Sequence, residues 1–104
     1  HANAFPSSKI KGAQVFYKSG CEKSRTLSIW IQHSLILEML NTYRVAKSIS
    51  NIYLIDHVRI PGCLIEVGFL SNQEELNNLK NTTYQDKIVR AIYLGIKEHL
   101  KNKQ

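Results

Sequence analysis

The sequence predicts an α/β domain, in which short buried strands alternate with helices. Two apolar runs rich in β-branched and aromatic residues, at 13–17 and 63–67, have the length of buried strands. Apolar residues recur at helical spacing over 26–40 and again over 84–100. Because strands and helices that alternate along a chain pack as layers, we expect a sheet flanked by helices. The 104 residues suffice for one small domain.

The first strand and the first long helix follow a polar loop. Residues 6–12 contain Pro, Ser and Gly, which are typical of turns. The strand at 13–17 comes next, and a second loop leads to the helix over 26–40, for which Glu22 and Ser24 are alternative first residues. This helix is apolar nearly all round, so we expect it to be well buried.

Two more helices are predicted in the last third of the chain. Ser71 and Glu74 have the spacing of a capping box, so a short helix should follow them and run to Lys80. Thr82 or Thr83 would then begin an amphipathic helix, whose apolar stripe lies opposite Lys and Arg residues. We expect this last helix to lie at the surface of the domain.

Two apolar segments in the second half are predicted as strands, and one of them contains a carboxylate. Residues 52–55 (IYLI) form the first segment and residues 63–67 (CLIEV) the second. Glu66 is costly within an apolar strand unless it is protonated, forms an ion pair or faces a cation. Pairing with Arg44 or Arg59 is one explanation. A functional role is the other, because sites in α/β sheets lie at the carboxyl ends of strands.

The composition limits the classes of partner. The net charge of +6 and the pI of about 9.5 favour anionic partners such as nucleic acid, an acidic membrane surface or an anionic cell wall. The lysines are dispersed along the chain without a nucleic-acid-binding motif, which argues against nucleic acid. No apolar run is long enough to span a membrane, and no leader with the pattern of an export signal is visible. Since the first residue is His rather than Met, we expect the chain to begin within a gene or after processing.

The cysteines and most histidines form no recognised metal-binding pattern. Cys21 and Cys63 lack metal-type spacing, and we expect two free thiols, with Cys63 acting as a small buried hydrophobe. Neither HxH nor HExxH occurs. His1 begins the run HANA, which by itself is only a weak signal for a metal ligand. Three histidines are expected to be structural or exposed: His33, His57 and His99.

Several segments together resemble a known family. They are HANAF (1–5), KGAQVFY (11–17), NTYRVAK (41–47), IPGCLIEVGFLSNQEE (60–75) and YQDKIVRAIYLGI (84–96). In this order they resemble the C-terminal part of the zinc-dependent N-acetylmuramoyl-L-alanine amidases of the amidase-3 family, in particular those of the spore cortex. The resemblance covers almost the whole chain, and the element E-x-G-F-L-S-N is highly specific. It implies a twisted mixed sheet flanked by helices. Residues 1–104 would then be the C-terminal portion of one catalytic domain, without its N-terminal strands.

The resemblance also implies a zinc site and a catalytic carboxylate. The second zinc-binding His of the family stands in a strand-end motif that residues 1–4 match from His1 onward, so His1 is the implied metal ligand. Glu66 opens the matched E-x-G-F-L-S-N element and is the implied catalytic residue. The other two zinc ligands of the family, a His and a Glu, lie upstream of the matched region. We therefore expect the 104-residue chain alone to be inactive.

The implied reaction is hydrolysis of the amide bond between N-acetylmuramic acid and L-alanine of the peptidoglycan stem peptide. Zinc would activate a water molecule, and Glu66 would serve as general base. The implied location is outside the cytoplasm, in the cell wall or spore cortex of an endospore-forming bacterium, with an accessory protein as a further partner. The alternative is a non-catalytic module on the same scaffold that binds the cell wall or a protein partner. If residues here had to complete the zinc site, His57 would be the first to consider.

Overall fold

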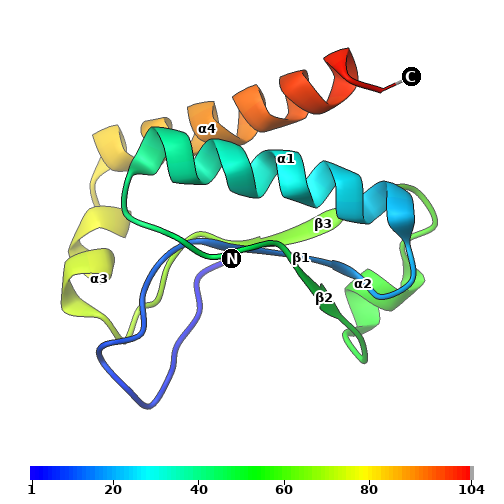
Figure 1. Ribbon diagram of the computed structural model, residues 1–104. Coiled ribbons are helices and arrows are strands. Elements are labelled where there is room, and N and C mark those ends of the chain that lie inside the picture. The colour runs from blue at the N-terminus through cyan, green and yellow to red at the C-terminus, as the bar shows by residue number, and fades with distance from the viewer. Residues whose placement is uncertain (104) are drawn as a thin grey trace.

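The layered arrangement expected from the sequence is confirmed, since two long helices cover one face of a mixed three-stranded sheet (Figure 1). The structure is a computed structural model and describes residues 1–103. Its elements are β1 (Gln14–Lys18), α1 (Glu22–Met39), β2 (Lys47–Ile49), α2 (Tyr53–His57), β3 (Cys63–Glu66), α3 (Gln73–Leu79) and α4 (Thr82–Lys101). In Figure 1, α1 and α4 lie together above the sheet, and the shorter helices α3 and α2 lie near its two ends.

The register of the sheet decides which side chains share a face. The strand order is β2-β1-β3, with β1 parallel to β2 and antiparallel to β3. Val15 lies opposite Ile65, and Gln14 lies opposite Glu66. Successive side chains of a strand point to opposite faces. Val15 and Ile65 therefore pack with the core beneath the helices, whereas Gln14 and Glu66 belong to the other face.

The core lies between the sheet and the two long helices. Its buried apolar residues are Ala13, Val15, Ile31, Leu35, Met39, Ile88 and Ala91. The backbones of α1 and α4 come close together at Gly95, where an added Cβ would lie 2.7 Å from the Cα of Ile31. A side chain at this position would force the helices apart, so Gly95 permits the close packing of α4 on α1.

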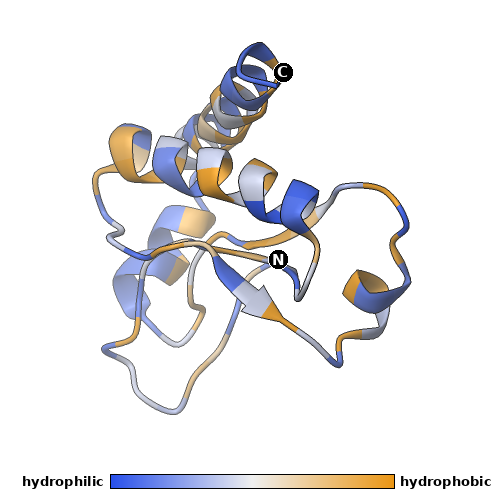
Figure 2. Ribbon diagram, turned by 45° about the vertical axis from the view of Figure 1, so that its right-hand side comes forward, coloured by the Kyte–Doolittle hydropathy of each residue, from blue (hydrophilic) through white to orange (hydrophobic). Residues whose placement is uncertain are grey.

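The prediction that α1 is well buried holds for one face of the helix only. Leu37 is 59% exposed and Ile29 is 42% exposed, and Figure 2 shows apolar and polar residues alternating along α1. Part of the inward face is polar instead. The Gln32 amide bonds to the backbone at 13–15 through both its oxygen and its nitrogen, and Ser34 donates to the backbone of α4. Hydrogen bonding of this kind allows polar side chains to be buried at little cost.

The prediction of a strand at 52–55 is wrong, because most of this segment lies in α2. Four apolar residues are too few to distinguish a strand from a helix by pattern alone. Asn51, with a φ of 63°, turns the chain directly after β2, and only Ile55 of the helix is buried. The strand in this region is β2 itself, whose exposed and half-buried residues show no apolar pattern that would predict it.

Asparagines, rather than the predicted residues, cap the last two helices. Asn72 caps α3 and Asn81 caps α4, and each side-chain oxygen accepts from the backbone N–H three residues on at 3.1 Å. The capping box of Ser71 and Glu74 is therefore a wrong prediction, while Thr82 is correctly placed as the first residue of α4. Asn and Ser cap helices about equally well, so sequence alone did not decide between neighbours. The first residue of α1 is Glu22, one of the two predicted.

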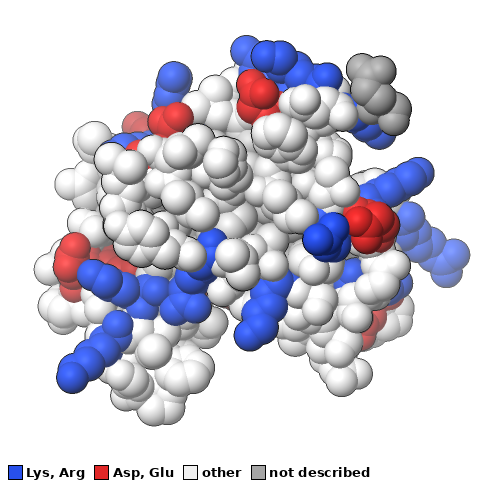
Figure 3. Space-filling model, viewed as in Figure 1, with Lys and Arg blue, Asp and Glu red and all other residues white. Residues whose placement is uncertain are grey.

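The charged surface agrees with the expectation of dispersed basic residues. On the face shown in Figure 3, Lys and Arg occupy several separate places, with Asp and Glu among them. The ion pairs within residues 1–103 are two exposed helical pairs, Arg25 with Glu22 at 3.0 Å and Lys101 with Glu98 at 3.5 Å. Among the described helices, none combines the length and the apolar character needed to cross a membrane.

Candidate functional site

The first residues of the chain lie beside β3 and extend the sheet. The backbone nitrogen of His1 donates to the carbonyl of Ile65 at 3.0 Å, and the N–H of Val67 donates to the carbonyl of His1 at 2.8 Å. This pair of bonds is the pattern of a parallel ladder in which His1 lies next to Glu66. Because neighbours in a ladder project to the same face, the two predicted site residues are brought together on one side of the sheet.

A bulge follows directly after this pair. Asn3 forms a parallel bridge with Phe69, so three steps from Glu66 to Phe69 match two steps from His1 to Asn3. Such a one-residue mismatch is a β-bulge, which bends a strand and redirects its side chains. Gly68 lies within the bulge, where an added Cβ would be 3.2 Å from a carboxylate oxygen of α3. The glycine of the E-V-G-F sequence therefore permits the close approach of β3 to α3.

One carboxylate oxygen of Glu66 is buried without a hydrogen-bond donor among the described residues. The residue as a whole is half-buried, and this oxygen is Oε2. No ion pair joins it to Arg44 or Arg59 within residues 1–103, so the structural explanation by ion pairing is wrong. A buried carboxylate oxygen without a donor is costly, and a cation or a bound water would relieve that cost.

Gln14 is a neighbour of Glu66 that the sequence did not identify as part of the site. It lies opposite Glu66 in the β1–β3 register and is only 6% exposed. Its amide nitrogen donates to the carbonyl of Val45, and its amide oxygen accepts from Nη1 of Arg44 at 3.4 Å. The signal that could have found it is a polar residue inside the apolar strand AQVFY.

A second carboxylate, Glu75, supports the bulge from behind. Its Oε1 accepts from the N–H of Gly12 at 2.8 Å and from the N–H of Phe69 at 3.2 Å, and the residue is only 5% exposed. Gly12 has a φ of +99°, which glycine adopts without strain. Glu75 thus joins α3, the loop before β1 and the segment after Glu66.

The donor set fits a metal site only in part. Within the described part of the chain, no three His, Cys, Asp or Glu side chains come together in a group that could hold a metal ion. His57 does not complete the site, because it lies on α2, stacks on Tyr53 and bonds to its carbonyl at 2.7 Å. It is exposed, as is His33, while His99 is half-buried, in agreement with the prediction for these three histidines. The residue next to Glu66 in the sheet that has a metal-binding side chain is therefore His1.

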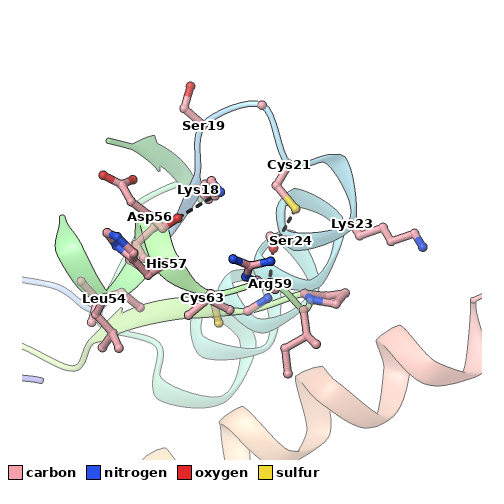
Figure 4. A pocket seen from close by; sticks show the side chains of 17 residues that line it. Lys18, Ser19, Cys21, Lys23, Ser24, Leu54, Asp56, His57, Arg59 and Cys63 are labelled. Atoms are coloured by element: carbon pink, nitrogen blue, oxygen red, sulfur yellow. Dashed lines mark hydrogen bonds between the residues drawn. The ribbon is translucent and has the colours of Figure 1, made fainter. Parts of the chain in front are cut away.

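A cavity lies at the other end of β3, at Cys63 (Figure 4). It has a volume of about 920 Å³ and is lined by residues 18–24 and 54–64, without His1 or Glu66. Two hydrogen bonds are drawn there, in which Cys21 donates to the hydroxyl of Ser24 and Lys18 donates to the carbonyl of Asp56. Because its lining contains neither His1 nor Glu66, this cavity is separate from the predicted site.

The two thiols near this cavity are free, as predicted, and have opposite tendencies. The hydrogen bond with the Ser24 hydroxyl, together with nearby backbone N–H groups, lowers the pKa of the Cys21 thiol. Burial raises the pKa of the Cys63 thiol. Cys21 is thus the more acidic of the two.

Solved structures define the class of protein. The chain matches the CwlD amidase from Clostridioides difficile, solved in complex with the GerS lipoprotein, with a TM-score of 0.94 and 44% identity over 97% of this chain and 52% of that one. It matches the catalytic domain of CwlV, an N-acetylmuramoyl-L-alanine amidase from Bacillus (Paenibacillus) polymyxa var. colistinus, with a TM-score of 0.85 and 28% identity over 99% of this chain and 56% of that one. The fold is that of amidase catalytic domains.

The chain belongs to the amidase-3 family of N-acetylmuramoyl-L-alanine amidases, whose family model matches residues 1–98. It is 45% identical over 103 residues to the germination-specific N-acetylmuramoyl-L-alanine amidase of Bacillus subtilis (strain 168), covering 99% of this chain and 44% of that relative. The chain thus spans about half the length of these relatives. The family in general is zinc-dependent. The family resemblance and the fold class expected from the sequence are confirmed.

Proposed function

We propose that this chain is part of an enzyme that hydrolyses the amide bond between N-acetylmuramic acid and the L-alanine of peptidoglycan stem peptides. The observation that carries the proposal is the position of Glu66 beside His1, on one face of the sheet, with one carboxylate oxygen buried and unpartnered. Membership of the family supports the reaction class. The proposed catalytic residue is Glu66, and the proposed metal ligand is His1.

The proposed role of Glu66 is to move a proton. An amide is a poor electrophile and neutral water is a poor nucleophile, so the reaction needs a base at the attacking water and an acid at the departing amine. The Glu66 carboxylate would accept the proton from water and return it to the amine of L-alanine. Its place at the end of β3, held between β1 and residues 1–3, keeps the carboxylate in a fixed position.

The proposed cofactor is zinc, with His1 as the ligand that this chain supplies through its imidazole. The orphaned oxygen of Glu66 suits a place that receives a cation or the water bound to one. Bound zinc would supply a water whose pKa is lowered toward ~7 and would polarise the amide carbonyl. Since residues 1–103 bring no three ligands together, we propose that the other protein ligands lie outside this chain segment.

We propose that residues 1–104 are the C-terminal portion of a single amidase domain. Two features support this division. Residues 1–3 already add a short strand to the outer edge of β3. The helix α4 also exposes an apolar stripe that further elements of such a domain would cover: Val89, Tyr93, Ile96 and Leu100.

The proposed setting is the cell wall or spore cortex of an endospore-forming bacterium. The support is the 45% identity to a germination-specific amidase. The CwlD relative was solved in complex with the GerS lipoprotein, and we propose an accessory protein of this kind as a partner of the present enzyme. The proposed substrate is peptidoglycan, and its anionic character suits the net charge of +6.

The test of the proposed function uses the full-length protein with zinc and purified peptidoglycan. Hydrolysis should release muropeptides with new L-alanine amino termini, measured by amine labelling and mass spectrometry. The Glu66→Gln variant should lose activity by about 100-fold or more, because Gln has the same shape but cannot accept or return a proton. Its zinc content and melting temperature should match those of the wild type.

The matched control is Glu74→Gln, which removes an exposed carboxylate from the first turn of α3. This variant should keep wild-type activity. A Glu66→Gln variant with full activity would exclude the catalytic role. A wild-type protein that binds peptidoglycan without producing new L-alanine amino termini would instead support the non-catalytic alternative.

A further inference from the structure

Arg44 is held in a defined position on the loop between α1 and β2. Its Nε donates to the carbonyl of Lys11 at 3.0 Å, and its Nη1 donates to the amide oxygen of Gln14 at 3.4 Å. Its guanidinium carbon lies 5.1 Å from the centre of the Phe69 ring, within the range of a cation–π contact. These contacts fix the direction of a side chain that would otherwise have many rotamers.

The same contacts place Arg44 near the proposed catalytic residue. Gln14, which accepts from Arg44, lies opposite Glu66 in the register of β1 and β3 and shares its face of the sheet. Cβ atoms of directly opposite residues are about 5 Å apart. The guanidinium of Arg44 is therefore linked to Glu66 through a single intervening side chain, that of Gln14.

The positive charge of Arg44 has no carboxylate partner in the described part of the chain. The ion pairs found there lie elsewhere, on α1 and α4. Glu75, which lies nearby, is engaged by the backbone N–H groups of Gly12 and Phe69. A guanidinium has five N–H donors, and within residues 1–103 two of those of Arg44 are used, one on Nε and one on Nη1. The remaining donors, on Nη1 and Nη2, are available for charge-assisted hydrogen bonds to a carboxylate.

We propose that Arg44 binds a carboxylate on the peptide side of the substrate and so determines which stem peptides the enzyme accepts. The inference rests on the proposed function, because it takes the peptide side from the bond that is cut. The carboxyl group of the muramic acid is itself part of that amide and carries no charge. A carboxylate near the scissile bond must therefore belong to the peptide, which leaves from the active site with its new amino terminus.

The test compares two substrates of the full-length zinc enzyme, an N-acetylmuramoyl dipeptide with a free terminal carboxylate and the same compound with a terminal carboxamide. The wild type should prefer the acid by about 10- to 100-fold in kcat/KM, the range expected for a charge-assisted pair. Arg44→Gln should lose this preference, mainly through a raised KM for the acid, and Arg44→Lys should restore part of it. The matched control, Arg59→Gln at the other end of β3, should keep the wild-type preference.

A second measurement separates this inference from the proposed function. Calorimetry with the free dipeptide acid and the free dipeptide amide, which lack the N-acetylmuramoyl group and the scissile bond, tests recognition without hydrolysis. Only the dipeptide acid should bind to the wild type. If the wild type binds the acid but hydrolyses neither substrate, the proposed function fails while the role of Arg44 is supported. Equal lowering of both rates by Arg44→Gln, with the acid preference intact, would show that Arg44 only anchors its loop. If Arg44→Gln does not fold, the wild type decides, because equal binding of acid and amide would overturn the proposal.

Discussion

The two ends of β3 differ in what they bring together. At its carboxyl end, Glu66 lies beside His1 and Gln14, with a buried oxygen that has no partner in the described residues. At its amino end, Cys63 lines a cavity of about 920 Å³. The two positions are three residues apart in the strand, a separation of ~10 Å. The cavity therefore lies at the opposite end of β3 from the buried carboxylate oxygen that has no hydrogen-bond partner within residues 1–103.

This difference shows which feature locates a site in this molecule. In the cavity, the hydroxyl of Ser24 accepts from the N–H of Gly62 and from the thiol of Cys21, so this buried hydroxyl has partners within the chain. At the Glu66 end, strands from distant parts of the sequence converge and leave one carboxylate oxygen without a donor. An unsatisfied buried group requires an explanation, whereas a hollow by itself does not.

The first prediction compares mutations at the two ends of β3 by their effect on zinc binding. In the full-length protein, His1→Ala should weaken zinc binding by more than the roughly 10- to 100-fold that follows loss of a residue supporting a metal ligand. A competition titration with a chromogenic chelator measures this change. His57→Ala, at the cavity end, is the control and should leave zinc affinity unchanged. Weaker zinc binding in His57→Ala but not in His1→Ala would show that the metal site lies at the cavity instead.

A second effect is expected on stability, and it too should differ between the two ends. Glu75→Ala leaves the buried N–H groups of Gly12 and Phe69 without an acceptor. At about 1–3 kcal/mol for each unsatisfied donor, the free energy of unfolding should fall by about 2–6 kcal/mol. Ser24→Ala, which removes the acceptor of Gly62, should cost only about 1 kcal/mol.

Urea denaturation of the full-length protein measures both changes, and Glu74→Ala is the exposed control, with an expected effect within about 0.5 kcal/mol. A Glu75→Ala variant as stable as the control would mean that the bulge after Glu66 does not depend on this carboxylate.

The sequence predicted those parts of the fold that local patterns determine. The strands β1 and β3 are apolar runs of sufficient length, and α4 has the stripe of an amphipathic helix. The segment 52–55 was predicted wrongly because four apolar residues fit a strand and a helix equally well. The strand β2 was missed because it contains no apolar alternation and is formed by pairing with β1. Its existence depends on tertiary context, which a local pattern does not contain.

The site was predictable to a similar extent. Glu66 stands out because a carboxylate is rare in an apolar strand, and His1 entered through the family motif that residues 1–4 match. The structure places these two residues side by side, while their chemical roles remain proposals. Gln14 is likewise a polar residue in an apolar strand, but its place opposite Glu66 depends on strand register. Glu75 has no such signal, because its role depends on a bond between residues 63 positions apart.

The smallest expected effect concerns the thiols and tests whether the two ends are functionally separate. The thiolate is the reactive form, so a thiol with a lowered pKa has a larger reactive fraction at neutral pH. The hydrogen bond with the Ser24 hydroxyl lowers the pKa of Cys21, and burial raises the pKa of Cys63. Iodoacetamide at neutral pH should therefore modify Cys21 first, and the alkylation rate of Cys21 should fall as the pH is lowered through its pKa. Mass spectrometry of timed samples measures both rates.

In Ser24→Ala, the pH profile of Cys21 alkylation should move to higher pH, because the hydrogen bond with the Ser24 hydroxyl, which lowers the pKa most, is gone. Because Cys21 lies at the cavity end, the modified full-length enzyme should keep its activity, and a loss of activity in step with Cys21 alkylation would show that the two ends are coupled.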